Sequence, residues 1–173
     1  MPRAVSVPPA RLGPPARGAA ACLALVVAGL LAGCGSGPVE IDEPDLGEEA
    51  AATCRELVED LPDTVADQRS RPVTPDGAAG AAWGDPAIVL TCGVGEPEGY
   101  VPEGPCTVVD GVGWYVPEEQ LDANGAVDLT MTTLFRQVDV EVVLPKEYWP
   151  PATALADLST VVAAHTEAEE KCL

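Results

Sequence analysis

The sequence predicts an α+β fold, in which a small antiparallel sheet of about four strands has N- and C-terminal helices packed on one face. Apolar residues recur at helical spacing in two segments, one after the acidic stretch that precedes residue 50 and one near the C-terminus. Short apolar, β-branched runs lie between them, separated by segments rich in Gly and Pro. The resulting order of helix, four strands and helix favours an antiparallel sheet.

Two amphipathic helices are expected, over residues 50–61 and 153–170. The apolar residues that recur at helical intervals are Cys54, Leu57, Val58 and Leu61 in the first helix, and Leu155, Leu158, Val161 and Val162 in the second. Pro62 directly follows the first pattern, so the first helix is expected to end there.

Four strands are expected between the helices, over residues 87–94, 107–116, 126–135 and 138–144. The second is expected to be interrupted near Gly111 and Gly113. In the last strand, apolar Val140 and Val142 alternate with acidic Asp139 and Glu141, which predicts one buried face and one wet face. Residues 63–86 and 95–105 contain many Pro and Gly residues and are expected to be irregular.

The N-terminus predicts an exported lipoprotein. A basic stretch and 13 uncharged residues, 19–31, lead into the run Leu31-Ala32-Gly33-Cys34, which matches a lipobox. A retained membrane anchor is the alternative, but 13 helical residues span roughly 20 Å of a hydrocarbon core about 30 Å thick. We therefore expect a signal peptide over residues 1–33, an acidic flexible linker over 34–49 and one α+β domain over 50–173. Cys34 would carry the lipid on the extracytoplasmic face of the cell membrane.

The charge of the mature chain excludes some partners. The whole chain has a net charge of −19, and all 28 acidic residues but only six of the nine basic ones follow Cys34, which gives −22 after cleavage. No basic patch is present to meet phosphates, so nucleic acid is not an expected partner. Adsorption to anionic lipid is excluded for the same reason, so membrane attachment has to come from acyl chains.

Four cysteines remain in the predicted domain: Cys54, Cys92, Cys106 and Cys172. An even number in an exported domain predicts two disulfides, for which three pairings exist. We favour Cys92–Cys106, which closes a local loop, together with Cys54–Cys172, which joins the two helices. A zinc site is the alternative, but there is no Cys-x-x-Cys pair and His165 is the only histidine, so no metal or cofactor is expected.

The run AWGDPAIVLTCGV, residues 82–94, resembles the signature of the DUF3515 family of actinobacterial exported proteins and lipoproteins of unknown function. Supporting positions are Cys54, the pair Leu61-Pro62, Trp114 after Gly-Val-Gly, the run 140–142 before Pro145, and the C-terminal helix. The resemblance covers about residues 50–173. It implies a single exported domain and supplies no catalytic residue.

Five residues are candidates for a binding site: Trp83, Asp85, Arg69, Arg71 and Arg136. Trp83 and Asp85 either form a tight turn that enters a strand or present an aromatic anchor on a binding surface. The three arginines are scarce cations in an acidic protein, and they either clamp an anionic ligand or form surface ion pairs.

No catalytic residue is expected. His165 has no nucleophile motif beside it in the sequence, and the mature serines, Ser36, Ser70 and Ser159, lie outside a Gly-x-Ser-x-Gly setting. We therefore expect a non-catalytic binding or adaptor module of the cell envelope, tethered near an envelope partner. The alternatives are a small-molecule-binding protein or an unrecognised enzyme of envelope metabolism, and a purely structural component. An exposed Trp on a flat sheet face would favour the adaptor, and a concave, apolar pocket next to those arginines would favour the small molecule.

Overall fold

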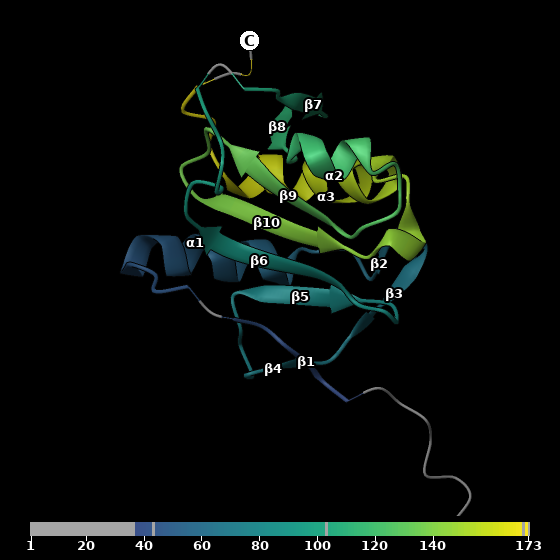
Figure 1. The fold of residues 1–173 in the computed structure, drawn as a ribbon. Helices are drawn as coiled ribbons and strands as arrows, with labels where there is room; N and C mark the ends of the chain where they lie inside the picture. Colours follow the sequence, from purple (N-terminus) through teal and green to yellow (C-terminus); the bar gives the residue numbers. More distant parts are fainter. Residues whose placement is uncertain (1–36, 43, 103, 171, 173) are drawn as a thin grey trace, which may run out of the picture. The chain divides into compact units, whose positions relative to one another are not determined.

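Figure 1 shows the protein as a computed structural model, which describes residues 37–42, 44–102, 104–170 and 172. The predicted signal peptide and Cys34 lie outside the described residues. The described helices are α1 (Glu48–Glu59), α2 (Glu118–Asp122) and α3 (Ala152–His165), with a 3₁₀ turn η1 (Lys146–Tyr148). The strands are β1 (Val39–Glu40), β2 (Thr64–Val65), β3 (Gln68–Arg71), β4 (Val73–Thr74), β5 (Gly80–Trp83), β6 (Ile88–Val94), β7 (Thr107–Val109), β8 (Val112–Tyr115), β9 (Leu129–Leu134) and β10 (Asp139–Leu144).

The main sheet has eight strands in the order β2-β3-β5-β6-β10-β9-β8-β7, and each neighbouring pair is antiparallel. The predicted α+β class with an antiparallel sheet is therefore confirmed. The prediction of about four strands was wrong, because two regions hold more strands than their composition indicated. The parallel pair β1–β4 lies apart from the main sheet.

Two tight turns account for part of the difference. In the segment expected to be irregular, β2 and β3 form a hairpin around Ala66 and Asp67, whose φ angles are 47° and 61°. In the expected strand 107–116, the interruption expected near Gly111 is a turn at Asp110 and Gly111, with φ angles of 48° and 82°, and it separates two paired strands, β7 and β8. Two-residue turns with positive φ at both positions match the right-handed twist of paired strands.

Helices α1 and α3 pack beside each other and cover one face of the sheet, the rear face in Figure 1. Leu57 of α1 and Leu158 of α3 are fully buried, and they meet Leu90 and Val142 from the strands in one apolar core. Burying a side chain of this size contributes about 1.5–3 kcal/mol. The opposite face of the central strands, which we call the open face, is not covered by α1 or α3 (Figure 1).

Part of the expected linker packs against the domain. Val39–Glu40 pairs with β4, and Ile41 is only 3% exposed. Leu46 packs against the core above Gly93, where a β-carbon would collide with its side chain. Residues 37–42 and Leu46 therefore belong to the folded unit, whereas Glu43 and residues 34–36 lie outside the described residues.

The four cysteines form two disulfides, but the favoured pairing was wrong. Cys54 of α1 pairs with Cys92 of β6, with their Cα atoms 5.6 Å apart. Cys106 pairs with Cys172, with Cα atoms 5.8 Å apart. Strand alternation turns the Cys92 side chain toward the helices, where it faces the buried side of α1. Cys92 therefore cannot reach Cys106, which lies in the loop before β7.

Candidate functional site

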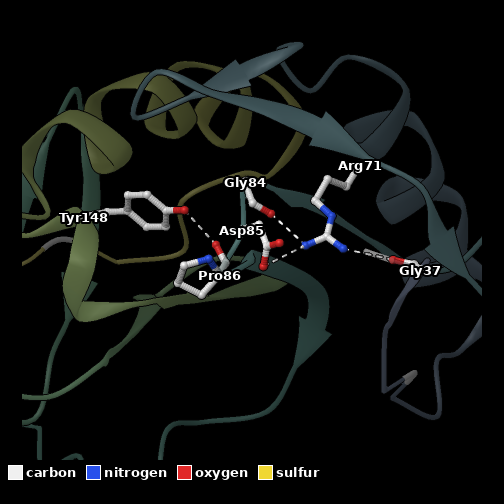
Figure 2. Close-up of polar contacts among 6 residues, drawn as sticks. All are labelled: Gly37, Arg71, Gly84, Asp85, Pro86 and Tyr148. Carbon is white, nitrogen blue, oxygen red and sulfur yellow. Dashed lines mark hydrogen bonds and ion pairs between the residues drawn. The ribbon is translucent and has the colours of Figure 1, made fainter. Parts of the chain in front are cut away.

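Arg71 and Asp85 are the predicted binding residues that the fold brings together (Figure 2). The Arg71 guanidinium donates hydrogen bonds to the carbonyl oxygens of Gly84, at 2.8 Å, and Gly37, at 2.9 Å. Its Nη1 atom also lies 3.9 Å from a carboxylate oxygen of Asp85. Arg71 thus ties the N-terminal segment to the turn after β5, and its donors are directed at backbone rather than into a cavity.

Tyr148 supports the same turn from η1. Its hydroxyl donates to the carbonyl oxygen of Pro86, at 2.8 Å (Figure 2). Gly84 lies between these contacts with a φ of 75°, and a β-carbon there would lie 2.8 Å from the Tyr148 hydroxyl. The turn therefore requires glycine both for its backbone conformation and for the close approach of Tyr148.

Trp83 cannot act as a surface anchor. Its side chain is 1% exposed, and its indole nitrogen donates to the carbonyl oxygen of Pro62, at 2.9 Å. The binding interpretation of Trp83 is therefore wrong, because pairing of β5 between β3 and β6 holds this position in the core. Trp83 thus has the structural role of the two that were considered, and it is not an aromatic anchor on a binding surface.

The other two arginines do not join Arg71 in a clamp. Arg69 is exposed on β3. Arg136 follows β9 and is 7% exposed, and its guanidinium donates to the hydroxyl of Thr166, at 2.8 Å, and to the Thr166 carbonyl oxygen. Burial lowers the pKa of Arg136, and Asp139 opposes this. Arg136 thus fastens the chain after α3 to the sheet.

Asp139 is a half-buried acid close to Arg136. Burial raises the pKa of Asp139 to about 6, while a hydrogen bond from Thr133, at 2.8 Å, opposes the shift. The Thr133 hydroxyl also accepts a hydrogen bond from the backbone nitrogen of Val140, at 2.8 Å. These contacts hold the irregular start of β10 in place, where its register with β6 shifts.

Two side chains that were weighed as possible catalytic groups, His165 and Ser159, are engaged in separate contacts. His165 lies 2.8 Å from a carboxylate oxygen of Asp60, which links the ends of α3 and α1. Ser159 is fully buried and accepts a hydrogen bond from the indole nitrogen of Trp114, at 3.0 Å. Neither side chain is placed to activate the other.

A polar row crosses the open face. The registers place Tyr115 of β8 opposite Thr132 of β9, Thr132 opposite Glu141 of β10, and Glu141 opposite Thr91 of β6. Neighbouring strands lie about 4.8 Å apart, so these four side chains form a continuous line across the sheet.

Three members of this row, Tyr115, Thr132 and Glu141, form the floor of a hollow of about 450 Å³, which we call the open-face pocket. Its walls are the loop Pro97–Gly99 and helix α2 with the preceding Pro117; the full lining is Pro97, Glu98, Gly99, Tyr115, Pro117, Glu119, Gln120, Thr130, Thr132 and Glu141. The amide oxygen of Gln120 accepts a hydrogen bond from the backbone nitrogen of Thr130, at 2.7 Å, which holds α2 at this wall. The volume lies within the range of about 300–1,000 Å³ that is typical of small-molecule sites.

Thr132 is the unusual residue of the open-face pocket. It is 1% exposed, and its hydroxyl is the one buried side-chain polar atom of the described residues that lacks a hydrogen-bond partner. A buried hydroxyl in a folded protein normally has a partner, so this one marks a place where a ligand can supply it.

Glu141 is the acid at the centre of the open face. It is half-buried, and burial raises the pKa of its carboxyl group. It also lines a second hollow of about 490 Å³, together with Glu40 and Asp42 from the N-terminal segment and Val89 and Val143 from the strands. Glu141 therefore lies where two neighbouring hollows meet.

The family model described as "Protein of unknown function (DUF3515)" matches residues 17–171. The chain belongs to the DUF3515 family. No match was found among the curated proteins or the solved structures. The family resemblance predicted from residues 82–94 is thus confirmed, and its description brings no activity or functional residue to the DUF3515 domain.

In the described part of this DUF3515 protein, no helix combines the length and apolar character needed to cross a bilayer. The residues of the open-face pocket were not among the predicted binding residues. The one sequence feature that pointed to this pocket was the alternation in β10, which predicted that Glu141 faces away from the core. The partner strands of Glu141 and the wall made by α2 could not be derived from that pattern.

Proposed function

We propose that this DUF3515 protein is an exported, lipid-anchored, non-catalytic binding module of the cell envelope, and that it binds its ligand at the open face. The observation that carries the proposal is the open-face pocket, which combines a suitable volume with an unpartnered Thr132 hydroxyl. Buried Trp83 removes the reason to place the contact at the turn after β5.

The proposed location rests on the run Leu31-Ala32-Gly33-Cys34 and is supported by the two disulfides. Disulfides form in oxidising compartments, as expected for a domain held outside the cytoplasmic membrane. Lipid on Cys34 would keep the module close to the membrane and raise its effective concentration for envelope components.

The two forms of the proposal differ in the ligand. An adaptor would bind an envelope protein, whereas the alternative form binds a small molecule. The volume of the open-face pocket favours a small molecule, although the arginines expected beside such a pocket are not among its lining residues. The buried Trp83 removes the exposed tryptophan that was expected of an adaptor.

Photocrosslinking in cells tests the proposal. A photoreactive residue is placed at Thr130, which lines the open-face pocket, and at exposed Ala163 of α3 as the matched control. Intact-mass analysis after irradiation detects both protein and small-molecule adducts. We expect one discrete adduct from position 130, none from position 163, and a weaker adduct when Cys34→Ala removes the tether.

The mass of the adduct separates the two forms, since a small increment indicates a small molecule and a large one an envelope protein. Palmitate labelling of the same cells should mark the wild-type chain and not Cys34→Ala. Identical adducts at both positions, or none at position 130, would contradict an open-face site.

A further inference from the structure

The open-face pocket is strongly acidic. Three carboxylates line it, Glu98 from the loop, Glu119 from α2 and Glu141 from β10, and none of its lining residues is Lys, Arg or His. The adjoining hollow adds Glu40 and Asp42 and likewise contains no basic lining residue. Charge complementarity therefore selects a cationic ligand.

Thr132 adds a geometric requirement. Thr132 belongs to the pocket floor beside Glu141, and its hydroxyl oxygen is buried and lacks a partner. A hydroxyl oxygen accepts hydrogen bonds. A donor that lies in the pocket over Thr132 of β9 and Glu141 of β10 would therefore supply the missing partner of the hydroxyl and face the Glu141 carboxylate. The ligand should therefore carry its positive charge on a hydrogen-bond donor.

The carboxylates do not converge as they would around a metal ion. Among the described residues, no group of three or more His, Cys, Asp or Glu side chains is close enough to hold one. A primary ammonium group suits the arrangement better, because it is a compact charge with three donors that reach acceptors on different strands. The apolar side chains of Val89 and Val143, in the adjoining hollow, provide contact for an aliphatic chain.

We propose that the open-face pocket binds the primary ammonium group of a small aliphatic amine, with Glu141 as counter-ion and the Thr132 hydroxyl as hydrogen-bond acceptor. This inference rests on the proposed function, because it names the ligand class of the same face. Burial raises the pKa of Glu141, and a bound ammonium group would offset that burial by favouring the ionised carboxylate.

Isothermal titration calorimetry of the full chain in neutral maltoside micelles tests the inference at constant ionic strength. The probe is 5-amino-1-pentanol, and 1,5-pentanediol is its neutral match in length. We expect saturable binding of one amine per chain, with the diol at least about tenfold weaker, because a charge-assisted hydrogen bond is lost.

Two variants locate the binding. Glu141→Gln should weaken amine binding at least about tenfold, whereas Glu56→Gln, the same charge change on the exposed side of α1, should change it less than about twofold. Thr132→Val should also weaken amine binding without lowering the thermal midpoint, since it removes a hydroxyl that has no partner in the fold.

The inference is overturned if amine and diol bind equally, if no saturable binding occurs, or if Glu56→Gln weakens binding as much as Glu141→Gln. A discrete adduct from position 130 in cells, without amine binding, would overturn the ligand class and leave the open-face site intact. If neither an adduct from position 130 nor amine binding is observed, the proposed function is overturned as well.

Discussion

Trp83→Ala is expected to lower the free energy of unfolding by about 3–5 kcal/mol, the usual cost of deleting a buried tryptophan ring. The ring is 1% exposed and belongs to the main core. Its loss would also leave the Pro62 carbonyl oxygen without the indole donor. Urea denaturation followed by circular dichroism measures the change.

Two controls separate packing from other effects of this substitution. Trp83→Phe keeps an aromatic ring and removes the hydrogen bond to Pro62, so its cost should be smaller. Val108→Ala changes a side chain that is 58% exposed, and it should shift stability by less than about 0.5 kcal/mol. A Trp83→Ala protein as stable as the wild type would contradict the buried position and restore Trp83 as a candidate for surface contact.

The disulfide between α1 and β6 is expected to have a comparable effect. Its sequence separation is 38 residues, for which the chain-entropy relation gives about 4 kcal/mol. Cys54→Ala combined with Cys92→Ala should therefore lower the free energy of unfolding by roughly that amount, measured in urea. Alanine is the suitable replacement because both positions are buried beside apolar side chains.

Peptide mapping without reduction provides the matching control. The wild-type chain should yield linked peptides for Cys54–Cys92 and Cys106–Cys172. The Cys54→Ala, Cys92→Ala chain should retain the second link alone. Recovery of a Cys92–Cys106 peptide would refute the connectivity and remove the reason for the stability difference.

The helices and central strands could be predicted because their patterns are local. The spacing of Cys54 and Leu57 marked the buried side of α1, and the alternation from Val138 to Val142 marked the two faces of β10. The family could also be predicted, because the contiguous run over residues 82–94 resembles its signature, and the family model matches residues 17–171.

The missed strands depend on turns with little compositional signal. Ala66 adopts a positive φ in the β2–β3 turn, although such turns favour Asn or Gly. Strands as short as β2 and β4 carry too few residues for an alternation to be seen. Disulfide connectivity failed for a different reason, since it depends on which face of β6 is turned toward α1.

The open-face pocket could not be predicted from the sequence, because it is formed by the order in which the strands pair. Tyr115, Thr132 and Glu141 lie on three different strands and become neighbours through the registers of β8, β9 and β10. The five-residue helix α2 was not expected, so the wall that it provides was not expected either. Only the outward position of Glu141 could be derived from alternation.

Methyl NMR of Thr132 tests the central claim of an ammonium site most directly. Threonine methyl groups are labelled in the full chain in micelles, and 5-amino-1-pentanol is added with 1,5-pentanediol as the neutral control. Thr166, which is buried beside Arg136, serves as the internal reference. We expect a saturable shift of the Thr132 methyl signal with the amine alone and no shift at Thr166. An unchanged Thr132 signal, or equal shifts with amine and diol, would contradict the site.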